Sequence, residues 1–314
     1  MPSSGQPCSS SYIQPHIRHI QVRIILSADL LQWIVMLPMS TKVPHLPTPV
    51  VLLIGLFDPT GQQDVPADAI TCANHGVHSV SAISGVSIAD SANILHIDPS
   101  APELFDEQIR FLLEDTPVQA IKVGCLPAVE HVSVIAQIAA DYPDVPLILH
   151  LGPRPPLEDP DELPTADSDL VVHASLELLV SQSEVVVVSP NATDRWLNED
   201  MTEMMDVGTG PQALLHMGAQ WVLLPGFRQR PGSTVYFLGH TEGLTVTWPW
   251  VAAPERTQDT TGLLTCSIAA QLASGIPMQA ACEAASRYEA DALSGAFQAG
   301  MGQRTAKRLT GGVS

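Results

Sequence analysis

The sequence predicts an α/β domain in three layers, with helices on both faces of a mostly parallel central sheet. Apolar runs such as residues 49–56 and 145–150 are continuous, as expected of strands buried on both faces of a sheet. Residues 103–115 instead show the apolar spacing of a helix that packs one face on a core. Strand and helix alternate along most of the chain, which indicates a parallel sheet.

The individual elements follow in chain order. A helix over 67–75 ends before Gly76, which suits a C-terminal cap, and Pro211 suits the first turn of a helix over 211–217. Short runs on either side of residues 240–243 predict a β-hairpin. The expected strands cover 49–56, 77–88, 120–123, 145–150, 185–188, 221–224, 235–238 and 244–248, and the remaining helices cover 103–115, 129–140, 265–273 and 278–298.

The chain divides into three predicted regions. Residues 1–47 are interpreted as a poorly ordered extension that could come from an upstream start codon, with Met39 as the natural first residue; a targeting segment is the alternative. The apolar run within it is interrupted by Asp29 and is too short for a membrane span. Residues 48–298 are expected to form the folded domain, and residues 299–314 a C-terminal tail.

The composition is that of a strongly acidic protein. Its 314 residues include 14 Lys and Arg against 33 Asp and Glu, for a formal net charge of −19. A field of this sign argues against nucleic acid or an anionic membrane as the main partner, and a phosphate-bearing ligand would need local neutralisation. The five cysteines show no C-x-x-C spacing, which favours reduced thiols in a cytoplasmic protein.

Polar segments follow several of the predicted strands. Residues 257–270 run from a polar turn with Gly262 into a helix of small residues. The free amides of a first helical turn can hold an anion, and Thr260, Thr261 and Thr265 could add hydroxyl donors; simple helix capping is the alternative. The other segments are Asp58-Pro-Thr-Gly-Gln-Gln-Asp-Val-Pro-Ala-Asp68, Ala120-Ile-Lys-Val-Gly-Cys-Leu126 and Ser189-Pro-Asn-Ala-Thr-Asp194.

In order and spacing, these four segments resemble the hydroxymethylpyrimidine and phosphomethylpyrimidine kinases of the ribokinase-like superfamily. Members of that family read D-P-S-G-G-A-G-x-Q-A-D, A-x-K-x-G-M-L, T-P-N-x-x-E and H-G-(T/S)-G-C. The resemblance covers residues 49–309 and implies a ribokinase-like α/β/α fold. It also implies ATP and Mg²⁺ as cofactors and phosphorylation of hydroxymethylpyrimidine or its monophosphate in thiamine-precursor synthesis. A homodimer would be compatible with it.

The resemblance assigns site residues by position. Asp68 would bind the polar edge of the pyrimidine, with an ordinary first-turn carboxylate as the alternative. Asn191 and Asp194 would hold Mg²⁺, and a turn after a strand is the alternative there. The other expected substrate contacts are Asp58, Thr60, Gly61, Ala89 and Cys125, and the other expected nucleotide contacts are Lys122, Gly226, Thr261 and Gly262, with Asn191 again.

The sequence departs from the family where the catalytic cysteine should be. Counting from Gly262 as the first glycine puts Leu264 and Thr265 at the second glycine and the cysteine, and counting back from Gly275 puts Gly262 itself at the base position. Neither residue can act as a base, and a one-residue slip would bring Cys266 toward the site only with a rotation of about 100° around the helix.

Other departures leave the function open between alternatives. Gln62, Gln63 and Asp64 replace small residues of the substrate loop. His150 replaces an acidic residue, either as a phosphate partner or as a buried histidine at the end of a strand. The kinase hypothesis therefore stands beside a degenerate relative that binds pyrimidine or nucleotide without turnover, and beside a kinase for a different small alcohol.

Overall fold

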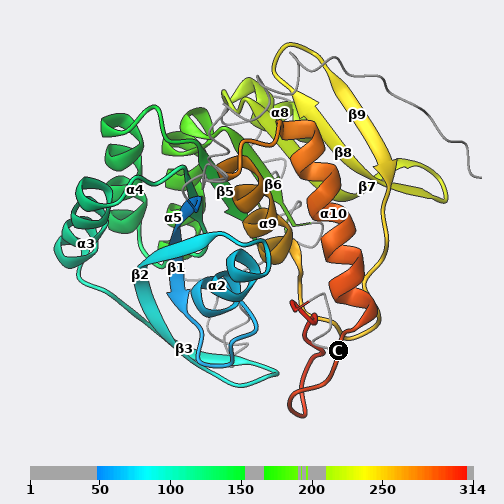
Figure 1. Ribbon diagram of the computed structural model, residues 1–314, viewed down its shortest axis with the longest axis horizontal. Helices are drawn as coiled ribbons and strands as arrows, with labels where there is room; N and C mark the ends of the chain where they lie inside the picture. The colour runs from blue at the N-terminus through cyan, green and yellow to red at the C-terminus, as the bar shows by residue number, and fades with distance from the viewer. Residues whose placement is uncertain (1–47, 153–165, 190–191, 193–195, 197–209, 310–314) are drawn as a thin grey trace, which may run out of the picture. The chain divides into compact units, whose positions relative to one another are not determined.

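The computed structural model describes residues 48–152, 166–189, 192, 196 and 210–309. They form one nine-stranded sheet in the order β3-β2-β1-β4-β5-β6-β7-β8-β9, with helices on both faces (Figure 1). The predicted three-layer α/β/α fold is therefore confirmed. The predicted extension over 1–47 and the predicted metal ligands Asn191 and Asp194 lie outside the described residues.

The centre of the sheet is parallel and both of its edges are antiparallel. Strands β2, β1, β4, β5, β6 and β7 pair in parallel, β3 pairs antiparallel with β2, and β7, β8 and β9 form an antiparallel meander. The meander contains the predicted hairpin. The strands are β1 Val50–Phe57, β2 His78–Ala89, β3 Ile94–Pro99, β4 Ala120–Val123, β5 Leu147–Leu151, β6 Val185–Val188, β7 Trp221–Arg230, β8 Ser233–His240 and β9 Thr245–Pro249.

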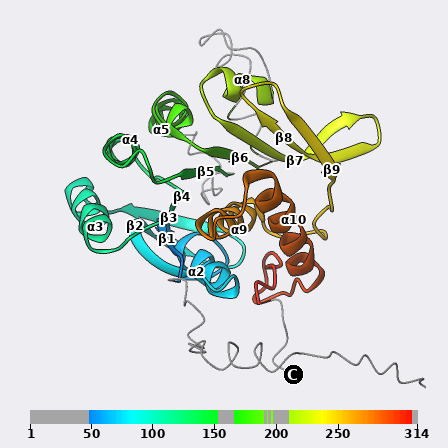
Figure 2. The same ribbon diagram turned by 45° about the horizontal axis from the view of Figure 1, so that its top comes forward.

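Alternate residues of the central strands supply two separate cores. Leu52 and Ile54 of β1 pack with α3, α4 and α5, whereas Val51 and Leu53 pack with α2, α9 and α10. Figure 2 shows these two sets of helices on opposite faces of the sheet. The helices are α2 Asp64–Asn74, α3 Pro102–Asp115, α4 Val129–Asp141, α5 Ala166–Leu178, α8 Pro211–His216, α9 Thr261–Ala273 and α10 Met278–Ser294, with a short 3₁₀ turn at Val180–Gln182.

The structure differs from the sequence prediction mainly at helix starts and sheet edges. Helix α2 begins at Asp64 and α9 at Thr261, each several residues earlier than expected, because their first turns contain Pro66 and Gly262, residues of low helix propensity. Strand β3 was not predicted, since its side chains are exposed or only half-buried. Within the described residues, no helix is both long and apolar enough to cross a membrane.

The predicted C-terminal tail packs against the domain over residues 299–309. Arg304 forms a β-bridge with Thr257, just before α9, and Thr305 forms another with Phe297. The amide of Gln303 donates to the carbonyl of Ser91, in the turn between β2 and β3. This segment therefore joins the turn that leads into α9 to the β2–β3 turn.

Substitutions of two phenylalanines of α3 test how this helix packs on the core. Phe105 is 1% exposed, whereas Phe111 is 77% exposed. We expect Phe105→Ala to lower the free energy of unfolding by about 3–5 kcal/mol, because it leaves a cavity in the core. Phe111→Ala should change it by no more than about 0.5 kcal/mol. Urea denaturation measures both, and equal effects of the two substitutions would contradict this packing.

Candidate active site

A cavity lies at the carboxyl ends of the central parallel strands, where open α/β sheets usually bind ligands. Its walls come from the loops after β1, β4 and β5, from the β2–β3 turn, and from the start of α9. Of the predicted site residues, the ones that line it are Asp58, Thr60, Ala89, Lys122, Cys125 and Gly262.

The loop after β1 is held by the side chain of Asp58. Its carboxylate accepts hydrogen bonds from the amide and hydroxyl of Thr60 at 2.9 and 2.7 Å, and from the amides of Gln62 and Gln63 at 3.1 and 2.9 Å. Gly61 adopts a positive φ of 66°, which a residue with a side chain rarely does. Asp58 therefore shapes the pocket wall, since its oxygens are engaged within its own loop.

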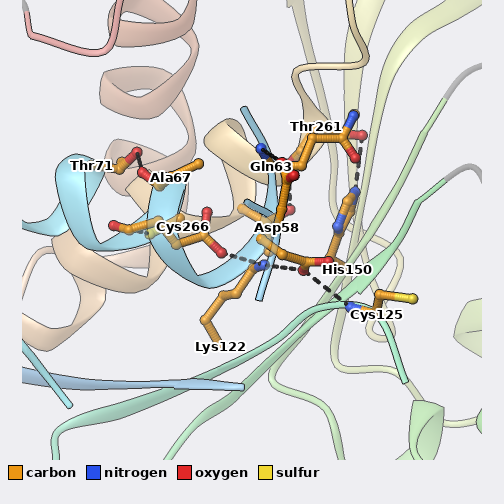
Figure 3. A network of polar contacts seen from close by, with 12 residues as sticks. Asp58, Gln63, Ala67, Thr71, Lys122, Cys125, His150, Thr261 and Cys266 are labelled. Carbon is orange, nitrogen blue, oxygen red and sulfur yellow. Dashed lines mark hydrogen bonds and ion pairs between the residues drawn. The ribbon is translucent and has the colours of Figure 1, made fainter. Parts of the chain in front are cut away.

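Lys122 forms an ion triplet with two aspartates of α2, and dashed lines mark its ion pairs in Figure 3. The ammonium of Lys122, on β4, is 2.6 Å from the carboxylate of Asp68 and 3.8 Å from that of Asp64. Burial alone would lower the pKa of Lys122, but the two aspartates outweigh burial and raise it. The lysine therefore stays charged while its side chain is 1% exposed.

Asp64, rather than Asp68, faces the cavity. Asp68 is buried against Lys122 and is not among the lining residues, whereas Asp64 is. Asp64 has a positive φ of 49°, and its carboxylate lies where a Cβ at Gly55 or Gly124 would be. These two glycines therefore leave the space that this carboxylate fills. Asp68, the residue expected to contact substrate, therefore lies behind the cavity wall, whereas Asp64, one helical turn earlier, lines it.

A second polar chain crosses the cavity from β5 to the start of α9. The Nε2 atom of His150 is 3.0 Å from the hydroxyl of Thr261, and that hydroxyl donates in turn to Asp259 (Figure 3). The other oxygen of Asp259 accepts from the hydroxyl of Ser189. Burial, together with the charge of Lys122, lowers the pKa of His150 to about 3, so the ring is neutral.

The start of α9 is more engaged than its sequence suggests. Each hydroxyl that was expected to be a free donor already has a partner: Thr260 donates to Glu289, Thr261 to Asp259, and Thr265 to the carbonyl of Thr261. The amide of Thr261 also donates to Asp259, at 2.9 Å. Only the amides of the following residues in the first turn are left to face an anion.

The two side chains considered as bases lie away from the cavity. Thr265 and Cys266 are fully buried, and the thiol of Cys266 is 3.6 Å from that of Cys72. Burial raises the pKa of Cys266 well above that of an ordinary thiol, so it stays protonated. Leu264 is also in the core, whereas Gly262 lines the cavity. The structure therefore brings neither Thr265 nor Cys266 to the wall of this cavity.

A second cavity lies on the other side of the α9 start, bounded by Trp250, Thr260 and Glu289. Its wall includes Pro225, next to Gly226, which has a positive φ of 72° in a bulge of β7. Glu289 accepts hydrogen bonds from Tyr236 at 2.7 Å and from Thr260 at 2.5 Å. Burial nonetheless raises its pKa to about 7.

Several of these residues could not be found from local sequence. Glu289 lies in no motif, and Asp259 lies in the polar segment 257–270 without a role assigned to it; one of its partners, Ser189, is 70 residues away in the chain. Arg308 was assigned to the tail, yet its guanidinium is buried and donates to the carbonyl of Gln62 at 2.8 Å and to the hydroxyl of Thr71 at 2.9 Å. The available signal was the rarity of basic residues in an acidic chain.

The electrostatics of Asp64 give a prediction for stability. Burial raises its pKa from 3.8 to about 6, although Lys122 opposes the change. A raised acid pKa means that the folded protein holds the proton more tightly than the unfolded chain. This stabilisation is complete below the unfolded pKa and is lost as pH rises to about 6.

We therefore expect Asp64→Asn to gain about 2–3 kcal/mol of unfolding free energy relative to the unsubstituted protein between about pH 4 and about pH 7. Urea denaturation across this range measures the difference. Asp115→Asn, at an exposed position at the end of α3, serves as the control for the loss of one carboxylate. If the free energies of unfolding of Asp64→Asn and of the unsubstituted protein change in parallel with pH, the pKa of Asp64 is not raised in the folded protein.

Comparison with known proteins finds kinases that are similar to this chain in sequence. The family model described as phosphomethylpyrimidine kinase matches residues 58–307. The hydroxymethylpyrimidine/phosphomethylpyrimidine kinase of Synechococcus elongatus is 28% identical over 271 residues, which cover 81% of this chain and 95% of that protein. A chloroplastic thiamine biosynthetic bifunctional enzyme of Arabidopsis thaliana is 27% identical over 259 residues; they cover 78% of this chain but 46% of that longer protein.

Solved structures show the same fold. A pyridoxal kinase of Bacillus subtilis, determined as an ADP complex, aligns with a TM-score of 0.66 at 18% identity, covering 83% of this chain and 97% of that one. The phosphomethylpyrimidine kinase of Clostridium difficile aligns with a TM-score of 0.60 at 16% identity, covering 77% and 97%. Because the family model spans most of the sequence, the chain belongs to the phosphomethylpyrimidine kinase family.

Proposed function

We propose that the protein transfers the terminal phosphoryl group of ATP to the hydroxymethyl group of a hydroxymethylpyrimidine or of its monophosphate, in the synthesis of a thiamine precursor. Membership of the kinase family supports the reaction class. The names of relatives such as the Synechococcus elongatus enzyme support the substrate. Cys72, Cys266 and Cys282 are free thiols, which fits the reducing cytoplasm proposed as its location.

The observation that carries the proposal is a wall shared by two cavities. Gln258 and Asp259 line both the cavity at the strand ends and the cavity beside Trp250 and Glu289. The first cavity is proposed to hold the alcohol and the second the nucleotide, so that the phosphates meet the hydroxyl where α9 begins. Phosphoryl transfer depends mainly on such positioning and on charge compensation.

The cavity at the strand ends suits a small polar heterocycle. Leu56, Leu126 and Val172 give it apolar walls, while Asp64 and Asn93 supply polar groups. An aminopyrimidine has a flat apolar body with N–H donors and ring-nitrogen acceptors at its edge, and pockets for such ligands combine these two kinds of wall.

The phosphates would approach the first-turn amides of Gly262 and Leu263, which have no carbonyl partner within α9. Asp259 already places negative charge there, and Mg²⁺ bound with ATP would neutralise part of the phosphate charge. The residues predicted to hold Mg²⁺ lie outside the described part of the chain. In the part that is described, no group of three or more His, Cys, Asp or Glu side chains is placed to bind a metal ion.

The activity is tested by incubating the protein with ATP, Mg²⁺ and hydroxymethylpyrimidine phosphate. We expect ADP release, together with a product heavier by one phosphoryl group in the mass spectrum. The matched control is the same pyrimidine with a methyl group in place of the hydroxymethyl group, which has no hydroxyl to attack phosphorus and should give no product. ADP release equal to the blank at high protein concentration would reject the proposal.

The same preparation separates the two alternatives. Thermal stabilisation by a non-hydrolysable ATP analogue or by the pyrimidine, without ADP release, would identify a binding protein that has lost turnover. ADP release with other small alcohols but not with pyrimidines would identify a kinase of different specificity. A homodimer stays a prediction from the family resemblance.

A further inference from the structure

The start of α9 offers no side chain of its own that could accept the proton of an attacking hydroxyl. Thr265 and Cys266 face the core, and Gly262 has no side chain. Any general base among the described residues must therefore reach this point from another element. His150, on β5, lines the same cavity as Gly262.

Gly152 makes room for the imidazole, and Gly262 lies beside it. A Cβ added at Gly152 would lie 2.6 Å from Cε1 of His150, and a Cβ added at Gly262 would lie 3.5 Å from Cε1 and 3.7 Å from Nδ1. The ring therefore lies beside the first turn of α9, in space that a side chain at position 152 would otherwise take. Its Nδ1 edge is turned toward Gly262, where phosphates are proposed to bind.

The hydrogen bonds around His150 determine which nitrogen carries the proton. The hydroxyl of Thr261 has one proton, and it donates that proton to the carboxylate of Asp259. Its oxygen can then only accept from Nε2 of His150, which is 3.0 Å away. Nε2 is therefore the protonated nitrogen, and Nδ1 keeps a free lone pair. Asp259 orients the base through an intervening hydroxyl, in the way a carboxylate orients a catalytic histidine.

We propose that His150 is the general base of the phosphoryl transfer, positioned by Thr261 and Asp259. This inference rests on the proposed kinase function. The substrate hydroxyl gives its proton to Nδ1 of His150 as its oxygen forms a bond to the terminal phosphorus of ATP. The bond between that phosphorus and the bridging oxygen breaks, and ADP leaves with the electron pair. The imidazolium then returns the proton to solvent.

The charges around His150 bear on the pH dependence. Burial and the charge of Lys122 on β4 both disfavour the imidazolium, and the charged group nearest the Nε2 side is Asp259, which is linked to the ring through Thr261. In the empty site the ring is neutral, and its lowered pKa makes it a weak base there. Phosphate charge beside Nδ1 would favour the imidazolium as the reaction proceeds.

The test compares His150→Gln and His150→Ala with the unsubstituted protein, using ADP release and calorimetric binding of a non-hydrolysable ATP analogue. We expect kcat to fall by about 10²–10⁴-fold while the nucleotide Kd changes by less than about threefold. Added imidazole should restore part of the activity of His150→Ala, because the ring leaves a cavity of its own shape. The matched control is His131→Gln, a buried histidine of α4 outside the cavity, which should keep kcat within about threefold.

Thr261→Val provides a second measurement, because it removes the hydroxyl that fixes the tautomer but keeps the base. We expect it to lower kcat less than His150→Gln and to move the acid limb of the pH–rate profile. Activity of His150→Gln within about threefold of the unsubstituted protein would overturn the proposal, as would a loss that imidazole does not restore together with an unchanged profile for Thr261→Val. If the unsubstituted protein itself releases no ADP, the proposed function fails and this inference fails with it.

Discussion

The buried ammonium of Lys122 is the interaction on which the rest of the site depends. It lies 2.6 Å from Asp68 and 3.8 Å from Asp64, and its side chain is 1% exposed. Without it, two carboxylates one helical turn apart would face each other in a region of low dielectric constant. The lysine comes from β4 and the aspartates from the first turns of α2, so the triplet also joins the sheet to this helix.

Other carboxylates at this edge of the sheet are also held by polar contacts with neighbouring residues. Asp58 holds its own loop, Asp259 holds Thr261 and Ser189, and Glu289 holds Thr260 and Tyr236. These groups are fixed before any ligand arrives, which is the arrangement that favours electrostatic catalysis. It has a cost, since burial raises the pKa values of Asp64 and Glu289 to about 6 and about 7. Buried carboxylates with raised pKa values lower the stability of the fold at neutral pH, and such groups are concentrated at functional sites.

The fold could be predicted from the sequence because its central strands are buried on both faces. The strands Ala120–Val123 and Val185–Val188 were predicted to the residue, since every side chain in them is buried. Strand β3 was missed because an exposed strand carries no apolar period, and the first turns of α2 and α9 were missed because they contain Pro66 and Gly262, residues of low helix propensity. The local apolar pattern identifies the strands that are buried on both faces, whereas the exposed strand and the first helical turns depend on tertiary contacts.

The site was predictable as a set of loops but not as a set of contacts. Motif position selected Asp68, whereas the left-handed conformation of Asp64 and the space at Gly55 and Gly124 put Asp64 at the cavity instead. His150 and Thr261 are 111 residues apart in the chain, so nothing in the sequence could pair them. The resemblance to a family found the region, and the geometry shows which of its residues line the cavity.

A double-mutant cycle on Lys122 and Asp68, measured by urea denaturation, tests the central claim most directly. Lys122→Met alone should lower the free energy of unfolding by about 3–5 kcal/mol, because it leaves two buried carboxylates without a cation. Adding Asp68→Asn should recover a large part of that loss, giving a coupling energy of about 1–3 kcal/mol. Additive effects of the two substitutions would show that the ammonium of Lys122 does not stabilise the buried carboxylate of Asp68.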